Sequence, residues 1–324
     1  MILKKVLNIA KNCSINYHSK LIAYTKDAIN KNRCKTLEPC LIIFCDGGIC
    51  SQIYQYMWGQ MLIDAGYAVK YDHTFYEDDG KDMYGIFDRS YVLDKLCYVE
   101  RLEIAPRFQA EYYRRHYLNP LNQPPYPDNT MSLHHHWCLP QYLGNYYTCD
   151  PQEYLSVIRK YIHIRPAHEI LDNENYKLYE KIISCDSIGV HVRRGDMVRA
   201  TSAWEAPTAN YFLQAIQCIN PTNKEFFFFS DEPDWVRGNI LPLLDNIKYH
   251  LVERNGSDKG YMDLFLLSRC KCQIGSQGSF GVVSFALNPN PNKLLILPFG
   301  SRKNVKNRLQ GQNVIYFDLC GNKI

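Results

Sequence analysis

The sequence predicts an α/β protein with two doubly wound domains that face each other across a cleft. Three observations carry this prediction. The 324 residues suit two domains of about 150 residues each better than one core. Short apolar runs typical of buried strands alternate with amphipathic runs typical of helices, which is the pattern of a parallel sheet covered by helices. This alternation starts near Leu41 and restarts near Ser187.

The N-terminal half opens with a strand–turn–helix–strand unit. A buried strand is predicted from Leu41 to Cys45, and it ends in the turn Gly47–Gly48. The next run, SQIYQYMWGQMLIDAG, has apolar residues at helical spacing and stops at Gly66. A second strand follows in YAVKYD. Such a unit begins a doubly wound domain.

The middle of the chain is less regular. Polar and aromatic residues fill Glu77–Pro127, where we expect helices and long loops. The run DPQEYLSVIRKYIHI then predicts an amphipathic helix with Asp150 as its cap and Pro151 in its first turn.

The C-terminal half repeats the α/β pattern. Strands are predicted in SIGVHV, EFFFFS, CQIG and KLLILP. EFFFFS does not alternate, so we expect it to be buried on both faces. Helices are predicted in APTANYFLQAIQCI, DEPDWVRGNI, MDLFLLSRC and SQGSFGVVSFALN. The predicted parts are a basic extension at 1–38, an N-terminal α/β domain at 39–178 and a C-terminal domain at 179–324, with a boundary near Asn173–Ser184.

The composition excludes several classes of protein. Hydrophobic residues make up 46% and charged residues 22% of the chain, as in ordinary globular proteins. A net charge of +4 is too small to indicate a nucleic-acid partner. No run approaches the roughly 20 apolar residues that cross a bilayer, and the N-terminus lacks the features of a signal peptide. The 13 Cys are scattered, which favours reduced thiols and a cytoplasmic protein.

The extension before Leu41 is rich in cations. It holds eight basic residues against Asp27 and Glu38: Lys4, Lys5, Lys11, Lys20, Lys26, Lys31, Arg33 and Lys35. Peripheral contact with the anionic inner face of the cytoplasmic membrane is one interpretation. A solvated terminal helix is the simpler one.

A group of charged residues follows the predicted strand IGVHV: His191, Arg193, Arg194 and Asp196. Ligands of parallel sheets bind at the carboxyl ends of strands. A guanidinium is always charged and its planar donors match phosphate oxygens. Because Asp196 cannot neutralise both arginines, we expect an anion here, and a diphosphate in particular. A surface salt-bridge cluster is the alternative.

The same residues carry a resemblance. HVRRGD resembles the His-x-Arg-Arg-x-Asp motif of the α-1,2-fucosyltransferase family and its α-1,6 and protein-O-fucosyltransferase relatives. Four more blocks resemble segments of that family in the same order, between Leu41 and Phe299: DGGICSQIYQYMWGQML, YLGNYYTCDPQEYL, FFFFSDEPDWV and DLFLLSRCKCQIGSQGSFGVVSFALN.

The resemblance implies a glycosyltransferase with two Rossmann-like domains of the GT-B type. It implies GDP-β-L-fucose as the donor, bound by the C-terminal domain, and a galactose-type hydroxyl of a glycan as the acceptor on the N-terminal domain side. The transfer would invert the anomeric centre, form an α-1,2 linkage and need no metal or other cofactor. Bacterial members of this kind act in the synthesis of O-antigen or other surface polysaccharides, some on lipid-linked acceptors.

The resemblance also implies roles for single residues. Arg193 would bind the diphosphate, with support from His191 and Arg194. The other expected donor-binding residues are Gly47 and Gly48 at the pyrophosphate, Asp263 at the guanine edge, Ser279 at a phosphate, and Asp231, which either contacts the ribose or caps a helix. The general base stays open between Asp196 and Glu205.

The sequence departs from the family in two blocks. The paired Trp of the family is absent from Ser276–Val283, and Ile49–Cys50 stands where the family has a third Gly. Acceptor contacts are therefore expected to differ. Alternatives stay open: another linkage (α-1,6 or α-1,3), a non-catalytic GDP-sugar-binding protein, and a metal-dependent transferase that uses an acidic pair such as Asp78–Asp79 or Asp231–Glu232. Three consecutive His at His134–His136 cannot converge easily on one ion, so no metal site is expected there.

Overall fold

The computed structural model describes residues 22–81, 85, 87–118, 140–143, 154–199, 205–299, 309 and 312–324. The chain divides into two compact units. Unit 1 consists of Met1–Phe44, Met61–Thr74 and Leu102–Asn145, and unit 2 of Cys45–Gln60, Phe75–Arg101 and Tyr146–Ile324. The predicted α/β class is confirmed, because each unit contains a parallel sheet. The domain limits drawn from the sequence, and a cleft between the domains, stay predictions.

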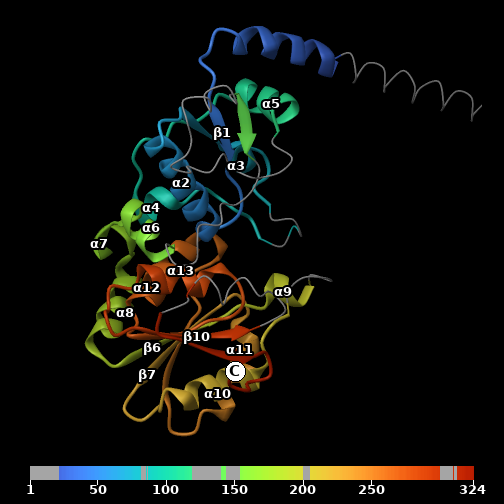
Figure 1. Ribbon diagram of the computed structural model, residues 1–324. Helices are drawn as coiled ribbons and strands as arrows, with labels where there is room; N and C mark the ends of the chain where they lie inside the picture. The colour runs from blue at the N-terminus through green and yellow to red at the C-terminus, as the bar shows by residue number, and fades with distance from the viewer. Residues whose placement is uncertain are drawn as a thin grey trace, which may run out of the picture. The chain divides into compact units, whose positions relative to one another are not determined.

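Unit 1 contains a three-stranded parallel sheet in the order β2-β1-β4 (Figure 1). Strand β1 is Leu41–Phe44, β2 is Val69–Asp72 and β4 is Gln141–Leu143. Helix α2, Ile49–Asp64, connects β1 to β2, so the predicted strand–turn–helix–strand unit is confirmed. Its first strand ends one residue earlier than predicted.

The described part of the basic extension packs against helix α5, Arg107–His116. Residues 22–34 are helical. The Nζ of Lys26 lies 2.7 Å from the Glu111 carboxylate, and the Arg33 guanidinium lies 3.7 Å from the centre of the Phe108 ring. These two cations of the extension are therefore used within unit 1. Residues 1–21 lie outside the described residues.

A buried polar cluster closes the carboxyl edge of the unit 1 sheet. Asp72 ends β2 and is fully buried. Its carboxylate accepts hydrogen bonds from the Tyr142 hydroxyl (2.7 Å), the Arg114 guanidinium (2.6 Å) and the backbone N–H of Thr74 (2.9 Å). Arg114 also stacks against the ring of Phe44, with 5.1 Å to its centre. This one carboxylate therefore joins β2 to β4 and α5, and β1 contacts the cluster through Phe44.

Unit 2 contains a six-stranded parallel sheet in the order β11-β10-β9-β6-β7-β8. The strands are β6 Ser187–Val192, β7 Glu225–Ser230, β8 Lys248–Val252, β9 Cys272–Ile274, β10 Leu294–Phe299 and β11 Val314–Asp318. The predicted strands β6, β7, β9 and β10 form the centre of this sheet. Strands β8 and β11 lie at its two edges and were not predicted.

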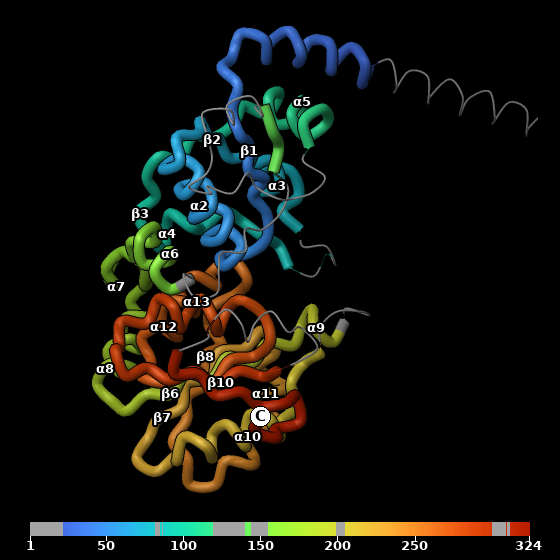
Figure 2. Tube along the Cα trace, in the orientation of Figure 1, coloured from blue at the N-terminus to red at the C-terminus, as the bar shows by residue number. Residues whose placement is uncertain are grey.

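Helices cover both faces of this sheet, as Figures 1 and 2 show. Helices α10 (Ala209–Cys218) and α11 (Pro233–Asn239) pack on one face, where Val190, Phe212 and Val236 join a continuous apolar core. Helices α12 (Gly260–Arg269) and α13 (Ser279–Leu287) cover the other face. The predicted helices of this half are confirmed.

The remaining described elements are mostly short. The expected boundary near Asn173–Ser184 is helix α8, which packs on α12. Helix α6 is Tyr154–Tyr161, and its predicted cap at Asp150 lies outside the described residues. The others are α3 Thr74–Asp78, α4 Leu93–Leu96, β3 Cys97–Tyr98, β5 His163–Ile164, α7 Ala167–Ile170, α9 Gly195–Arg199, η2 Leu241–Leu243 and η3 Ser257–Lys259.

Candidate active site

The predicted charged group lies at the carboxyl end of β6 in unit 2. Every residue of this strand is buried, so the sheet fixes the backbone that presents Arg193. The guanidinium donates through Nε to Oδ1 of Asp196 at 2.9 Å and through a terminal nitrogen to the other carboxylate oxygen. Burial alone would raise the pKa of Asp196, but the hydrogen bonds and charge of Arg193 hold that pKa below its ordinary value. Asp196 therefore orients Arg193.

A serine connects this strand end to the loop before α13. The Ser276 hydroxyl donates to the carbonyl of His191 at 2.8 Å and accepts from the backbone N–H of Arg193 at 2.9 Å. Ser276 opens the segment that lacks the paired Trp, so the altered segment still holds the arginine in place.

His191 is buried and stacks on Phe280, with 4.5 Å between ring centres and 18° between planes. Burial, helped by the Arg193 charge, lowers the pKa of His191 to about 3, so the ring is neutral at physiological pH. Its Nδ1 is buried and has no hydrogen-bond partner in the described part of the chain. A polar atom of this kind is available to a ligand.

The second arginine points to other partners. The Arg194 guanidinium lies 3.9 Å from the centre of the Trp235 ring, and its Nε is 3.6 Å from the Glu232 carboxylate. The structure thus brings Arg193 to Asp196 and Arg194 to helix α11. A contact of Arg194 with a diphosphate stays a prediction.

Asp231 shapes the turn between these arginines and α9. Its carboxylate accepts from the backbone N–H of Arg194 at 2.9 Å and of Gly195 at 3.1 Å. A Cβ at Gly195 would stand 2.8 Å from Cζ of Phe87 and 3.0 Å from the Asp231 carboxylate. The sequence left two roles open for Asp231, a ribose contact and a helix cap. The carboxylate caps the start of helix α9. The ribose contact stays a prediction.

The Gly47–Gly48 turn lies in the same unit. Gly47 has a φ of +72°, which favours Gly, and its carbonyl accepts from Gln52 and Tyr76. A Cβ at Gly48 would stand 3.3 Å from a terminal nitrogen of Arg89. Arg89 was not among the residues predicted for the site. No local pattern marks it, because its neighbours in the sequence are polar and aromatic.

The turn is followed by a contact between the starts of two helices. Cys50 lies in the first turn of α2, and Ser279, the first residue of α13, follows Gly278 with a φ of +108°. Burial raises the pKa of the Cys50 thiol to about 12, and the Ser279 hydroxyl and the charges of Arg193 and Arg89 oppose this rise. The thiol is therefore neutral. Cys50, which stands with Ile49 where the family has its third Gly, therefore lies beside Ser279, the residue expected to bind a phosphate.

Asp263 and Glu205 make no hydrogen bond or ion pair with the described residues of this group. Asp263 on α12 accepts from the Asn255 amide at 2.6 Å, and burial raises the pKa of Asp263 to about 7 despite this bond. Asn255 also exchanges hydrogen bonds with Asn175 at 3.0 and 3.1 Å. Glu205 is exposed and makes no hydrogen bond or ion pair with a described residue.

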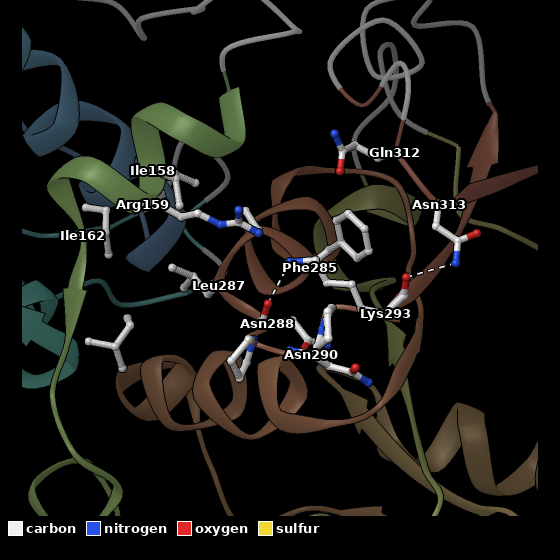
Figure 3. A pocket seen from close by; sticks show the side chains of 14 residues that line it. Ile158, Arg159, Ile162, Phe285, Leu287, Asn288, Asn290, Lys293, Gln312 and Asn313 are labelled. Carbon is white, nitrogen blue, oxygen red and sulfur yellow. Dashed lines mark hydrogen bonds between the residues drawn. The ribbon is translucent and has the colours of Figure 1, made fainter.

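A cavity of about 550 Å³ lies at the other end of α13 (Figure 3). Figure 3 shows Arg159 and Lys293 beside Phe285. The buried Lys293 donates to the Asn288 carbonyl at 2.7 Å, at the end of α13. This cation therefore stabilises a helix C-terminus. The cavity borders the residues before β10 and β11, and none of the predicted donor-binding residues lines it.

No metal cluster is present among the described residues: no group of three or more His, Cys, Asp or Glu could hold an ion. His134–His136 lie outside these residues. The helices that the structure describes include none long and apolar enough to cross a bilayer.

Comparison with known proteins places this chain in a family. The profile of glycosyl transferase family 11 matches residues 128–304, more than half of the chain. An alpha-1,2-colitosyltransferase of Escherichia coli is 30% identical over 117 residues, which are 33% of this chain and 39% of that protein. The O-antigen biosynthesis glycosyltransferase WbnK of Escherichia coli is 24% identical over 128 residues, 37% of this chain and 41% of that protein. The match thus spans about two-fifths of each curated relative.

Two solved structures resemble the chain more loosely. A mutant of FUT1 from Arabidopsis thaliana in complex with GDP has a TM-score of 0.43 at 13% identity, over 82% of this chain and 71% of that one. POFUT1 in complex with GDP has a TM-score of 0.43 at 14% identity, over 86% and 99%.

Proposed function

The chain belongs to glycosyl transferase family 11, and from this premise we propose that it transfers L-fucose from GDP-β-L-fucose to a galactose-type hydroxyl of a glycan, with inversion and in α-1,2 linkage. The observation that carries the proposal is the placement of Arg193. At the carboxyl end of β6, Asp196 accepts hydrogen bonds from the Arg193 guanidinium and Ser276 accepts one from the Arg193 backbone N–H. This is the edge of a parallel sheet where ligands bind.

The arrangement suits a diphosphate leaving group. Departure of GDP leaves new negative charge on the β-phosphate, and fixed cations and helix N-termini stabilise such charge. Groups of this chain that would do so include Arg193, the start of α13 at Ser279 and the buried Nδ1 of neutral His191, which has no hydrogen-bond partner among the described residues. Gly47 and Gly48 would let the backbone approach the donor. Transfer with oxocarbenium character at the sugar then needs an acceptor hydroxyl on the opposite face.

Asp196 and Glu205 are the two candidates for the general base, and their hydrogen bonds and exposure differ. Asp196 has both oxygens on Arg193 and a lowered pKa, which makes it a weak base. We therefore assign Asp196 to positioning Arg193. Glu205 is exposed and stays the candidate for the base.

The acceptor and the sugar are proposed from the relatives. One is a glycosyltransferase of O-antigen biosynthesis, which favours a surface polysaccharide acceptor. The other is a colitosyltransferase, so colitose is the second candidate for the transferred sugar.

Incubation with GDP-fucose and a panel of galactosides, followed by linkage analysis of the product, tests the proposal. We expect an α-1,2-fucosylated product and turnover that EDTA leaves unchanged. A product in α-1,6 or α-1,3 linkage would contradict the proposed linkage. Tight GDP binding without any product would support a non-catalytic binding protein instead.

Asp263 gives the proposal a pH dependence. Only the ionised carboxylate can accept from both the N1–H and the amino group of guanine, and the pKa of Asp263 is about 7. Above this pH the carboxylate is ionised. Below it we expect GDP affinity to fall by up to about tenfold per pH unit, as for one coupled proton, while ADP affinity stays constant.

Calorimetric titrations between pH 5.5 and 8.5 check this dependence. Asp263→Asn should bind GDP with a flat pH profile and should discriminate less against ADP. Asp258→Asn, at an exposed position nearby, is the control. An identical pH profile in Asp263→Asn and the unmodified protein would remove Asp263 from guanine recognition.

The proposal places the enzyme at the cytoplasmic face of the membrane, with the basic extension in contact with anionic lipid. Helix 22–34 exposes Ile22 (68%), Tyr24 (76%) and Ile29 (53%), and Lys31 lies on the same helix. Changing Lys31 and Lys35 to Gln should lower co-sedimentation with anionic vesicles. Unchanged co-sedimentation would contradict this contact.

A further inference from the structure

We propose that Arg89 binds the diphosphate of the donor together with Arg193. This inference rests on the proposed function, because it takes the ligand to be a nucleoside diphosphate sugar. It adds a residue that lies more than 100 positions before the His-x-Arg-Arg-x-Asp motif in the sequence.

The guanidinium of Arg89 lies against the Gly47–Gly48 turn. A Cβ at Gly48 would stand 3.3 Å from a terminal nitrogen of Arg89 and 3.7 Å from its Cζ. Contact at this distance leaves no room for a larger side chain at Gly48 unless the guanidinium moves. The turn at which we expect the backbone to approach the pyrophosphate is therefore already next to a cation.

The charges of Arg89 and Arg193 influence the pKa values of the same two residues, Asp196 and Cys50. The charges of both guanidinium groups lower the pKa of Asp196, and both oppose the rise in the pKa of Cys50. The Ser279 hydroxyl, at the start of α13, opposes the same rise in the pKa of Cys50. Two cations and a helix N-terminus thus gather around one carboxylate and one neutral thiol. A site of this composition favours an anion with several oxygens.

The backbone on either side of Arg89 is anchored. Its N–H donates to the carbonyl of Gly80, a residue with a φ of +57°. Two residues earlier, the Phe87 ring fills the space beside Gly195, and the Arg89 guanidinium lies 4.9 Å from the centre of that ring. The segment Phe87–Arg89 therefore runs from the turn after Arg194 to the Gly47–Gly48 turn. The absence of a side chain at Gly195 leaves room for the Phe87 ring, and its absence at Gly48 leaves room for the Arg89 guanidinium.

A second guanidinium has a chemical role in this reaction. The leaving diphosphate carries its charge on several oxygens, and a single guanidinium can contact only two of them with parallel hydrogen bonds. A second preorganised cation stabilises the charge that develops as the bond to the sugar breaks. Arg89 is a second cation that the structure places beside the same turn.

Titration of GDP against GMP isolates this contact, because the two ligands differ by the β-phosphate alone. We expect Arg89→Ala to lower GDP affinity at least tenfold while GMP affinity changes less than twofold. Arg89→Lys should keep part of the preference for GDP, since it retains the charge without the planar donors. Arg237→Ala, which removes an exposed arginine paired with Asp234 and Glu253, should match the unmodified protein.

The outcomes separate this inference from the proposed function. A GDP-to-GMP preference in Arg89→Ala and Arg89→Lys equal to that of the unmodified protein would overturn the role of Arg89. Failure of the proposed function would instead appear in the unmodified protein, as no preference for GDP over ADP and UDP. If thermal denaturation shows that Arg89→Ala or Arg89→Lys is unfolded, Arg89→Gln takes its place. An unchanged GDP-to-GMP preference in Arg89→Gln would likewise overturn the role of Arg89.

Discussion

Arg193→Ala is expected to lower kcat/KM for the donor by at least about a thousandfold and to remove most of the affinity for GDP. Arg193 is the group that the sheet, Ser276 and Asp196 hold in one position. Its removal takes away the fixed cation for the leaving group. It also leaves the carboxylate of Asp196, half-buried at the same site, without its partner.

Turnover assays and GDP titrations on Arg193→Ala, Arg193→Lys and Arg237→Ala measure this effect. The lysine variant should recover only part of the activity, because an ammonium cannot form the paired hydrogen bonds that Arg193 makes with Asp196. The Arg237 variant should be fully active. Near-normal turnover in Arg193→Ala would show that the site has been assigned to the wrong residues.

Asp72→Asn is expected to lower the free energy of unfolding by about 3 kcal/mol, because an amide cannot satisfy the three donors that surround this buried carboxylate. Tyr142, Arg114 and the Thr74 backbone all point to it. Asp79→Asn makes the same change at an exposed position and should leave stability unchanged. Chemical denaturation of the two variants gives the comparison.

The pH dependence of this effect has a definite sign. Burial alone would raise the pKa of Asp72, but the hydrogen bonds of Tyr142, Thr74 and Arg114 hold it below its ordinary value. The stabilisation is therefore present above the unfolded-state pKa of about 4 and is lost as the pH falls through the folded-state value. The difference in the free energy of unfolding between Asp72→Asn and the unmodified protein should therefore become smaller in acid. A difference that stays constant down to pH 3 would contradict the role of the ionised carboxylate.

The sequence predicted the central strands because their signal is local. EFFFFS and SIGVHV are fully apolar over most of their length, as burial on both faces requires. The edge strand β8 (KYHLV) was missed since its half-exposed positions carry polar residues and so lose this signal. The edge strand β11 (VIYFD) is apolar in four of its five residues and was not predicted although it carries the signal. The boundary expected near Asn173–Ser184 coincides with helix α8, and the domain limits stay a prediction.

The candidate site divides in the same way. The sequence predicted a site at Arg193 and Asp196 because the strand end and both side chains lie within one short stretch, and the structure pairs these two side chains. The separation of Arg194 from Arg193 could not be foreseen, since it depends on Trp235 of another helix. The sequence did not point to Arg89 and Phe87, because each is singled out only by a residue that is distant in the sequence. Arg89 lies beside Gly48, and Phe87 lies beside Gly195.

Calorimetric titration with GDP, UDP and ADP, with and without EDTA, tests the central claim most directly. The account predicts tight binding of GDP, weak binding of UDP and ADP, and no effect of EDTA. Equal binding of the three nucleotides would contradict the assignment of the donor. Binding of GDP that EDTA abolishes would contradict the claim that Arg193 and the start of α13 hold the diphosphate without a metal.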